Sequence, residues 1–175
     1  MYELFVSTIV LVVTELESSG GTTTTEPGHA TDLLALENQV CFALAVASRR
    51  VIGLYRPLLE PMGLTHPQYL VMLALWRREP LTVKELADTL SLESATLSPL
   101  LKRLEATGYL TRTRNPLDER TLRLHLTSEG RALREQATGI PVAMMERLGM
   151  TVTELQDFHA RLTEVIERTA EPTTD

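Results

Sequence analysis

The chain has 175 residues, of which 43% are apolar and 23% charged, and its net charge is −6. This length suits one domain with appendages, and the composition excludes a membrane protein, a collagen-like chain and a chain that is disordered throughout. The only cysteine, Cys41, excludes an internal disulfide and the common Cys/His zinc frameworks. The negative net charge argues against a generally polycationic nucleic-acid binder, but it allows a confined basic surface.

The first thirty residues predict an appendage to the domain. Residues 4–13 are largely apolar, but this run is about half of what a bilayer span requires, and no Lys or Arg precedes Arg49 as a secretory signal needs. Residues 17–30 are rich in Gly, Ser, Thr and Pro, which is typical of a linker. We therefore expect residues 1–31 to be disordered or weakly ordered, and we expect a cytoplasmic protein without a membrane partner.

Apolar residues at steps of three and four predict three long helical segments. The first runs from Asp32 to about Met62 and is expected to bend at Pro57. The second covers about residues 127–148, with a bend at 139–141, and the third covers about residues 151–169.

Three shorter helices are predicted between these segments. Capping-box patterns, in which a hydroxyl residue is followed three positions later by Gln or Glu, open helices at about 66–77 and 82–90. After a turn at 91–94, a helix is predicted from 95 to about 106, with Ser94 as its cap.

A change of period after Gly108 predicts a β-hairpin. Side-chain types alternate in twos over residues 109–114 and 121–126, and residues 115–120 between them are turn-rich. Two short helices joined by a four-residue turn and followed by a hairpin make a winged helix-turn-helix. The predicted fold class is therefore mainly α with a small β part (α+β).

A short basic segment of this acidic chain lies in the same region. Residues 95–126 contain six Lys or Arg and three Asp or Glu, a local charge of +3. The predicted helix 95–106 would read a major groove, and the hairpin arginines would reach a neighbouring minor groove, with Asp118 holding Arg120 at the tip. A chance excess of charge, or a winged domain used for protein contacts, is the alternative. The candidate DNA contacts are Ser94, Thr96, Ser98, Lys102, Arg103, Arg112, Arg114, Asp118 and Arg120.

Four segments then carry a family resemblance: CFAL at 41–44, LTHPQYLVML at 64–73, SATLSPLLKRL at 94–104, and the hairpin with RTR at 112–114 and DER at 118–120. They closely resemble the MarR family, specifically its organic-hydroperoxide-sensing OhrR branch, over about residues 32–168. The resemblance implies a winged helix-turn-helix at about 64–126 and N- and C-terminal dimerisation helices at about 32–62 and 127–169. It also implies a homodimer that represses an organic-hydroperoxide-reducing enzyme until a peroxide oxidises its cysteine.

The resemblance also assigns the redox residues. Cys41 matches the sensing cysteine, and Tyr55 matches a tyrosine that hydrogen-bonds this cysteine across the dimer interface. The second family tyrosine falls on His66, where we expect an imidazolium to stabilise the thiolate of the partner copy. The chain lacks the second cysteine of some relatives, so the resemblance implies the one-cysteine type, in which a small cellular thiol caps the oxidised sulfur. Oxidation to sulfinic acid competes with this capping.

Two alternatives from other classes remain. A MarR-type repressor released by a small aromatic or phenolic ligand would leave Cys41 with a structural role. A one-cysteine thiol peroxidase would turn over peroxides, but no catalytic base, resolving cysteine or cofactor motif supports it. We therefore predict a regulator that is not an enzyme and has no cofactor or metal site.

Overall fold

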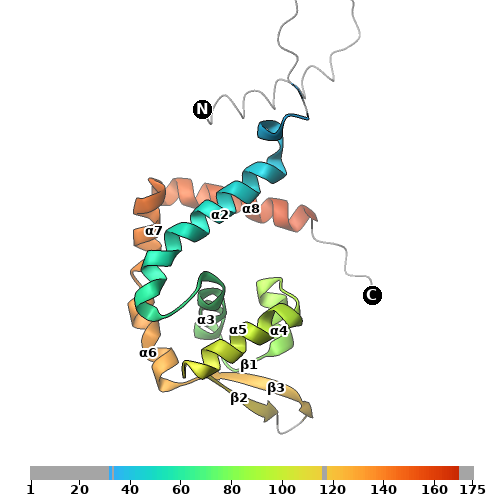
Figure 1. Ribbon diagram of the computed structural model, residues 1–175, viewed down its shortest axis with the longest axis vertical. Helices are drawn as coiled ribbons and strands as arrows, with labels where there is room; N and C mark the ends of the chain where they lie inside the picture. Colours follow the sequence, from blue (N-terminus) through green and yellow to red (C-terminus); the bar gives the residue numbers. More distant parts are fainter. Residues whose placement is uncertain (1–31, 33, 116–117, 170–175) are drawn as a thin grey trace, which may run out of the picture. The chain divides into compact units, whose positions relative to one another are not determined.

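The computed structural model describes residue 32, residues 34–115 and residues 118–169, with side chains left undescribed at 115–121 (Figure 1). The expectations for residues 1–31 lie outside this part. The chain divides into two compact units, one up to Val51 and one from Ile52. In the described part, every helix is too short or too polar to span a bilayer.

The first predicted helix is confirmed over most of its length. A short 3₁₀ helix, η1 (Leu36–Asn38), precedes α2 (Val40–Leu59), which contains Pro57 and continues from the first unit into the second. A second 3₁₀ turn, η2 (Glu60–Met62), follows and ends at Gly63 in the left-handed conformation, with φ of 64°. Glycine adopts this conformation without strain, so the helical turn ends there before the next helix.

The three short helices are also confirmed, as α3 (His66–Arg77), α4 (Val83–Leu90) and α5 (Ser94–Ala106). The cap of α4 is reciprocal: Glu85 accepts from the Thr82 N–H at 2.7 Å, and the Thr82 hydroxyl accepts from the Glu85 N–H at 3.1 Å. The prediction that Ser94 caps α5 is wrong. Ser94 is the first helical residue, and Glu93 holds the extended N-cap position without a side-chain bond.

The hairpin consists of β2 (Leu110–Asn115) and β3 (Asp118–Leu126), which pair antiparallel with Leu110 opposite Leu126. A third strand that the sequence analysis did not predict, β1 (Leu81–Thr82), pairs with the other edge of β3. The sheet order is therefore β1-β3-β2. Figure 1 shows the hairpin of β2 and β3 extending beyond the short strand β1. This is the wing of a winged helix-turn-helix.

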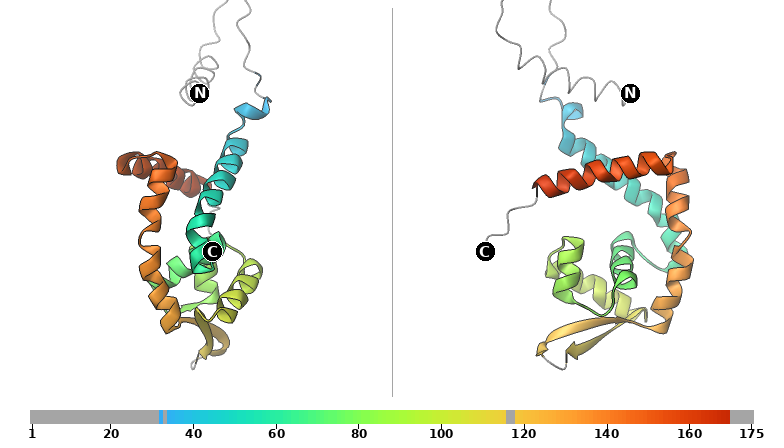
Figure 2. Two further views of the ribbon diagram at one scale, coloured as in Figure 1. Left: turned by 60° about the vertical axis from the view of Figure 1, so that its left-hand side comes forward. Right: turned by 180° about the vertical axis from the view of Figure 1, so that it is seen from behind.

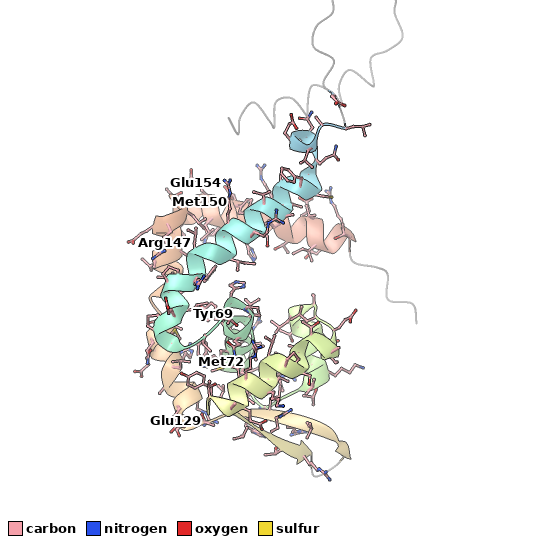
Figure 3. All side chains as sticks on the ribbon, viewed as in Figure 1. Tyr69, Met72, Glu129, Arg147, Met150 and Glu154 are labelled. Atoms are coloured by element: carbon pink, nitrogen blue, oxygen red, sulfur yellow. The ribbon has the colours of Figure 1, made fainter. Side chains whose placement is uncertain are left out.

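The core of the second unit joins the helices to the wing. Leu97, Leu101 and Leu104 place one side of α5 in the core. Figure 3 labels Met72, a fully buried residue of α3. The largest fully buried side chains come from α2, α3, α4, α5, β2 and β3: Leu59, Val71, Met72, Leu75, Leu86, Leu97, Leu101, Leu104, Leu110 and Leu124.

The C-terminal part differs from the prediction. The expected bent helix is two helices, α6 (Ser128–Ala137) and α7 (Ile140–Leu148), because Pro141 in the first turn of α7 has no N–H to donate back to α6. The last helix, α8 (Val152–Thr169), is confirmed, and its axis turns away from that of α7 (Figure 2). None of its residues is buried.

Glu79, in the loop between α3 and β1, links this loop to β3 and to α6. Its carboxylate accepts from the Leu126 N–H at 2.8 Å, at the end of β3, and from Arg131 Nε at 2.8 Å, on α6. Burial acts to raise the pKa of Glu79, but the hydrogen bonds from Arg131 and Leu126 favour the carboxylate and together lower this pKa. The carboxylate form therefore stabilises the fold.

We expect Glu79→Gln to lower the free energy of unfolding by about 1 kcal/mol at pH 7, because a neutral amide replaces a charged acceptor. A lowered folded-state pKa stabilises the fold above the unfolded-state value of about 4.3, and this contribution disappears as the pH falls through the folded-state value. Denaturant titrations of variant and parent should therefore converge in acid. The exposed Glu135→Gln is the control, and a constant difference at all pH values would refute this role for Glu79.

Candidate DNA-binding surface and redox site

One side of α5 presents polar and basic groups because the leucines occupy the other side. Ser94, Ser98 and Lys102 follow each other at intervals of four and so form a stripe along the helix. Thr96 and Arg103 are also exposed. Within the described part of the chain, Lys102 has no hydrogen-bond or ion-pair partner. The helix therefore offers hydroxyl donors and a free cation on an open surface.

The predicted DNA-contacting residues of the wing differ in exposure and in pairing. Arg114 is exposed on β2. Arg112 is half-buried and pairs with Glu105 of α5, with Arg112 Nε donating to the carboxylate at 2.9 Å. This hydrogen bond lowers the pKa of Glu105 and raises that of Arg112, so both groups are charged. Asp118 and Arg120 lie on β3, and their side chains are outside the described part.

The predicted redox residues lie in two units. Cys41, near the start of α2, is exposed and belongs to the first unit. Tyr55 of α2 and His66, the first residue of α3, are half-buried in the second unit, and their ring centroids are 4.8 Å apart at an interplanar angle of 56°. The turn at Gly63 brings these two rings together.

The rings of Tyr55 and His66 continue into an aromatic row that the sequence analysis missed. Tyr69, labelled on α3 in Figure 3, lies 6.0 Å from Tyr55 and 6.2 Å from Trp76 between ring centroids. The Trp76 indole donates to the Gly130 carbonyl at 2.8 Å, at the start of α6. The seven-residue spacing of Tyr69 and Trp76 on one helix was the available signal.

The aromatic row favours neutral groups. Burial raises the pKa of Tyr55 and of Tyr69, with a smaller contribution to Tyr69 from Tyr55, and burial lowers the pKa of His66. His66 is therefore a neutral imidazole at pH 7 in the single chain, whereas the sequence analysis expects an imidazolium next to a thiolate. A neutral imidazole and a phenol each still provide one hydrogen-bond donor.

Pockets between helices of the second unit include two with aromatic or imidazole groups in their walls. One, of about 590 Å³, lies between the C-terminal half of α2 and the start of α3 and includes His66 in its wall. The other, of about 350 Å³, lies between α3 and the α6–α7 segment, and its wall includes Tyr69, Trp76, Arg77 and Arg134. Both volumes suit small ligands.

The terminal helices carry apolar side chains that the single chain leaves exposed. On α8 these include Phe158, Val165 and Ile166, which are 39%, 49% and 65% exposed. Val40 and Phe42 on the first half of α2 are likewise exposed. An amphipathic helix with no buried residue is stabilised when its apolar face packs against another surface.

Comparisons with known proteins agree on one group of regulators. The MarR family model matches residues 64–122. The organic hydroperoxide resistance transcriptional regulator of Bacillus subtilis (strain 168) is 40% identical over 136 residues, which are 78% of this chain and 92% of that protein. The HTH-type transcriptional regulator SarZ of Staphylococcus saprophyticus is 38% identical over 133 residues, which are 76% of this chain and 91% of that protein.

A solved structure supports the same grouping. Reduced AbfR bound to DNA, a protein of Staphylococcus epidermidis, superposes with a TM-score of 0.64 at 33% identity and covers 76% of this chain and 93% of that chain.

The Arg112–Glu105 pair generates a test of the candidate surface. Glu105→Gln removes a negative charge beside Arg112, so we expect DNA to bind about 3- to 10-fold more tightly at low salt and the difference to shrink as salt rises. Fluorescence anisotropy with a labelled duplex measures this. Glu146→Gln, an exposed carboxylate on α7, is the control, and equal affinities for parent and Glu105→Gln would place Arg112 away from the phosphates.

Proposed function

Because the chain belongs to the MarR family of transcription regulators, we propose that it is a homodimeric repressor that releases its operator DNA when an organic hydroperoxide oxidises Cys41. One observation carries this proposal: the only cysteine of the chain is exposed, in a chain 40% identical to an organic hydroperoxide resistance regulator. As a member of this family, the chain is a DNA-binding regulator and not an enzyme.

For DNA binding, we propose that the exposed stripe of α5 enters a major groove and that the wing reaches the adjacent minor groove. Lys102 supports this, because it has no partner among the residues that the structure describes and an unpaired cation is available to phosphates. The DNA-bound state of AbfR, a relative with the same fold, supports it as well. The proposed contacts are Ser94, Thr96, Ser98, Lys102, Arg103, Arg112, Arg114, Asp118 and Arg120.

For assembly, we propose a symmetric dimer formed by the terminal helices. The unburied apolar side chains of α8 and of the first half of α2 support this, since a second copy is the surface most readily available to cover them. The domain organisation proposed from the sequence follows: a winged helix-turn-helix at about 64–126 and dimerisation helices on either side.

For sensing, the thiolate of Cys41 attacks the hydroperoxide, which gives a sulfenic acid on the cysteine and releases the corresponding alcohol. A small thiol then caps the sulfenic acid. We assign Tyr55 and His66 of the second copy as hydrogen-bond donors to this sulfur. Their close contact supports the assignment, because it holds a phenol and an imidazole side by side. Capping enlarges the substituent on the Cys41 sulfur and changes its charge. At the proposed dimer interface, this change displaces the DNA-binding units.

Cys41→Ser is expected to bind DNA like the parent and to stay bound after addition of cumene hydroperoxide, because serine cannot be oxidised in this way. Gel-shift assays of both proteins, with a small thiol present, measure this. The parent treated with peroxide and then with excess dithiothreitol is the control, and it should bind again. Release of the serine variant by peroxide would end the proposal.

Arg120→Ala and Lys102→Ala are each expected to weaken DNA binding by about 1–3 kcal/mol with the dimer intact, because each removes a cation from the proposed interface. Arg168→Ala removes a cation from the last turn of α8 and should leave binding unchanged. Anisotropy titrations at moderate salt, with the dimer checked by light scattering, distinguish these cases. If Arg120→Ala binds like Arg168→Ala, the wing does not contact DNA.

The pocket of about 350 Å³ favours a second candidate function, a repressor released by a small aromatic acid. Tyr69 and Trp76 provide aromatic walls, and Arg77 and Arg134 have no ion-pair partner in the described part of the chain. Under this alternative, Cys41→Ser would still be released by benzoate or salicylate, and Arg134→Ala would weaken that response.

A further inference from the structure

The pocket of about 590 Å³ beside His66 contains two opposite charges without partners. Arg56 lies on α2, and Glu60 follows it one helical turn later at the start of η2. Both side chains are exposed in the pocket wall. Within the part of the chain that the structure describes, they pair neither with each other nor with another residue.

The rest of the wall is mainly apolar. Ile52, Leu64 and Pro67 provide hydrocarbon surface, and Thr65 and His66 provide the polar groups at the start of α3. The volume is within the usual range of small-molecule sites. The pocket thus combines an apolar wall with one cationic and one anionic side chain.

This combination selects for ligand charge. A guanidinium binds a carboxylate through charge-assisted hydrogen bonds, and a carboxylate binds an ammonium group. A purely anionic ligand would be repelled by Glu60, and a purely cationic one by Arg56. A ligand that carries both charges satisfies both side chains. An uncharged hydroperoxide with an apolar tail would satisfy neither of them.

We propose that this pocket binds the small thiol that caps oxidised Cys41, and that the thiol it prefers carries both a carboxylate and an ammonium group, as amino-acid thiols do. The inference rests on the proposed function, which brings Cys41 of the second copy next to Tyr55 and His66. His66 is in the pocket wall, so a thiol held by Arg56 and Glu60 lies beside the sulfur that it attacks.

The capping step balances without a further reactant. The thiol sulfur bonds to the sulfenic sulfur of Cys41, and the S–O bond of the sulfenic acid breaks. The hydroxyl group leaves as water with the proton of the thiol. The products are one mixed disulfide and one water molecule.

The test uses the full chain, oxidised with one equivalent of cumene hydroperoxide, with the sulfenic acid quantified by dimedone trapping. Four thiols are then added separately. Cysteine carries both a carboxylate and an ammonium group, 3-mercaptopropionate only the carboxylate, cysteamine only the ammonium group, and 2-mercaptoethanol no charge. Mass spectrometry follows the mixed disulfide over time. Each thiol is compared between parent and variant, so its intrinsic reactivity cancels.

Arg56→Gln is expected to slow capping by cysteine and by 3-mercaptopropionate about 10-fold, the loss of one charge-assisted hydrogen bond. Glu60→Gln is expected to slow cysteine and cysteamine by a similar factor and to speed 3-mercaptopropionate. Both variants should react with 2-mercaptoethanol like the parent, and circular dichroism checks that they are folded. Arg161→Gln, an exposed cation on α8, should change no rate.

The outcomes distinguish a failure of the proposed function from a failure of the thiol-pocket inference alone. If dimedone traps no sulfenic acid in the parent, the proposed function and the inference both fail. If sulfenic acid forms but all four thiols cap the variants and the parent equally fast, the inference alone is overturned. It is also overturned if Arg56→Gln changes only the rate of oxidation by cumene hydroperoxide, because the pocket would then bind the oxidant.

Discussion

The close approach of Gly130 to Tyr109 is the constraint on which the DNA-binding unit depends. A Cβ at position 130 would lie 2.0 Å from the Tyr109 carbonyl oxygen, so only glycine allows α6 to begin there. The same carbonyl accepts from the Thr127 N–H at 3.1 Å, and the Tyr109 hydroxyl donates to the Met62 carbonyl at 3.0 Å. One residue at the base of the wing therefore fixes the start of α6 and the end of η2.

This junction also connects the wing to the aromatic row. The Gly130 carbonyl accepts from the Trp76 indole, and Trp76 is followed in the row by Tyr69 and Tyr55. In the proposed mechanism, a displacement of α3 that follows capping of Cys41 beside Tyr55 would act on Gly130 and through it on Tyr109. Packed side chains with few alternative arrangements transmit such displacements rather than absorb them. The proposed release thus has a continuous set of contacts within the second unit.

The sequence predicted what depends on local chemistry and missed what depends on distant partners. Capping-box patterns placed α3 and α4, because this signal lies within the first turn of a helix; they could not place the cap of α5, where Glu93 and not Ser94 is the N-cap. Strand β1 is two residues long and is defined by its pairing with β3, in which Leu81 lies opposite Leu124. No local sequence pattern predicts such a strand. The sequence analysis expected a bent helix at 139–141. Pro141 instead lies in the first turn of a new helix, so α6 ends before it and α7 begins there.

The site shows the same division. Counting charges located the basic segment, but it cannot show that Arg112 is paired with Glu105 while Lys102 has no partner among the described residues. The contact between Tyr55 and His66 was predictable only through the family resemblance, because the turn at Gly63 that creates it has no effect on the periodicity of either helix. The pockets lie between elements, so their walls combine residues that no single motif contains.

Under the proposed mechanism, the charge distribution would allow a modest displacement to release the DNA. The chain carries −6 overall and residues 95–126 carry +3, so the rest of the chain has a net charge of −9 and the cations of α5 and the wing are the ones proposed to attract DNA. Each charged contact contributes on the order of 1–3 kcal/mol. In the proposed dimer, both units must meet their half-sites together, and the second contact benefits from a high effective concentration only while the spacing is right. Misplacing one unit therefore removes that advantage as well as its own contacts, and the negative remainder of the surface then favours dissociation.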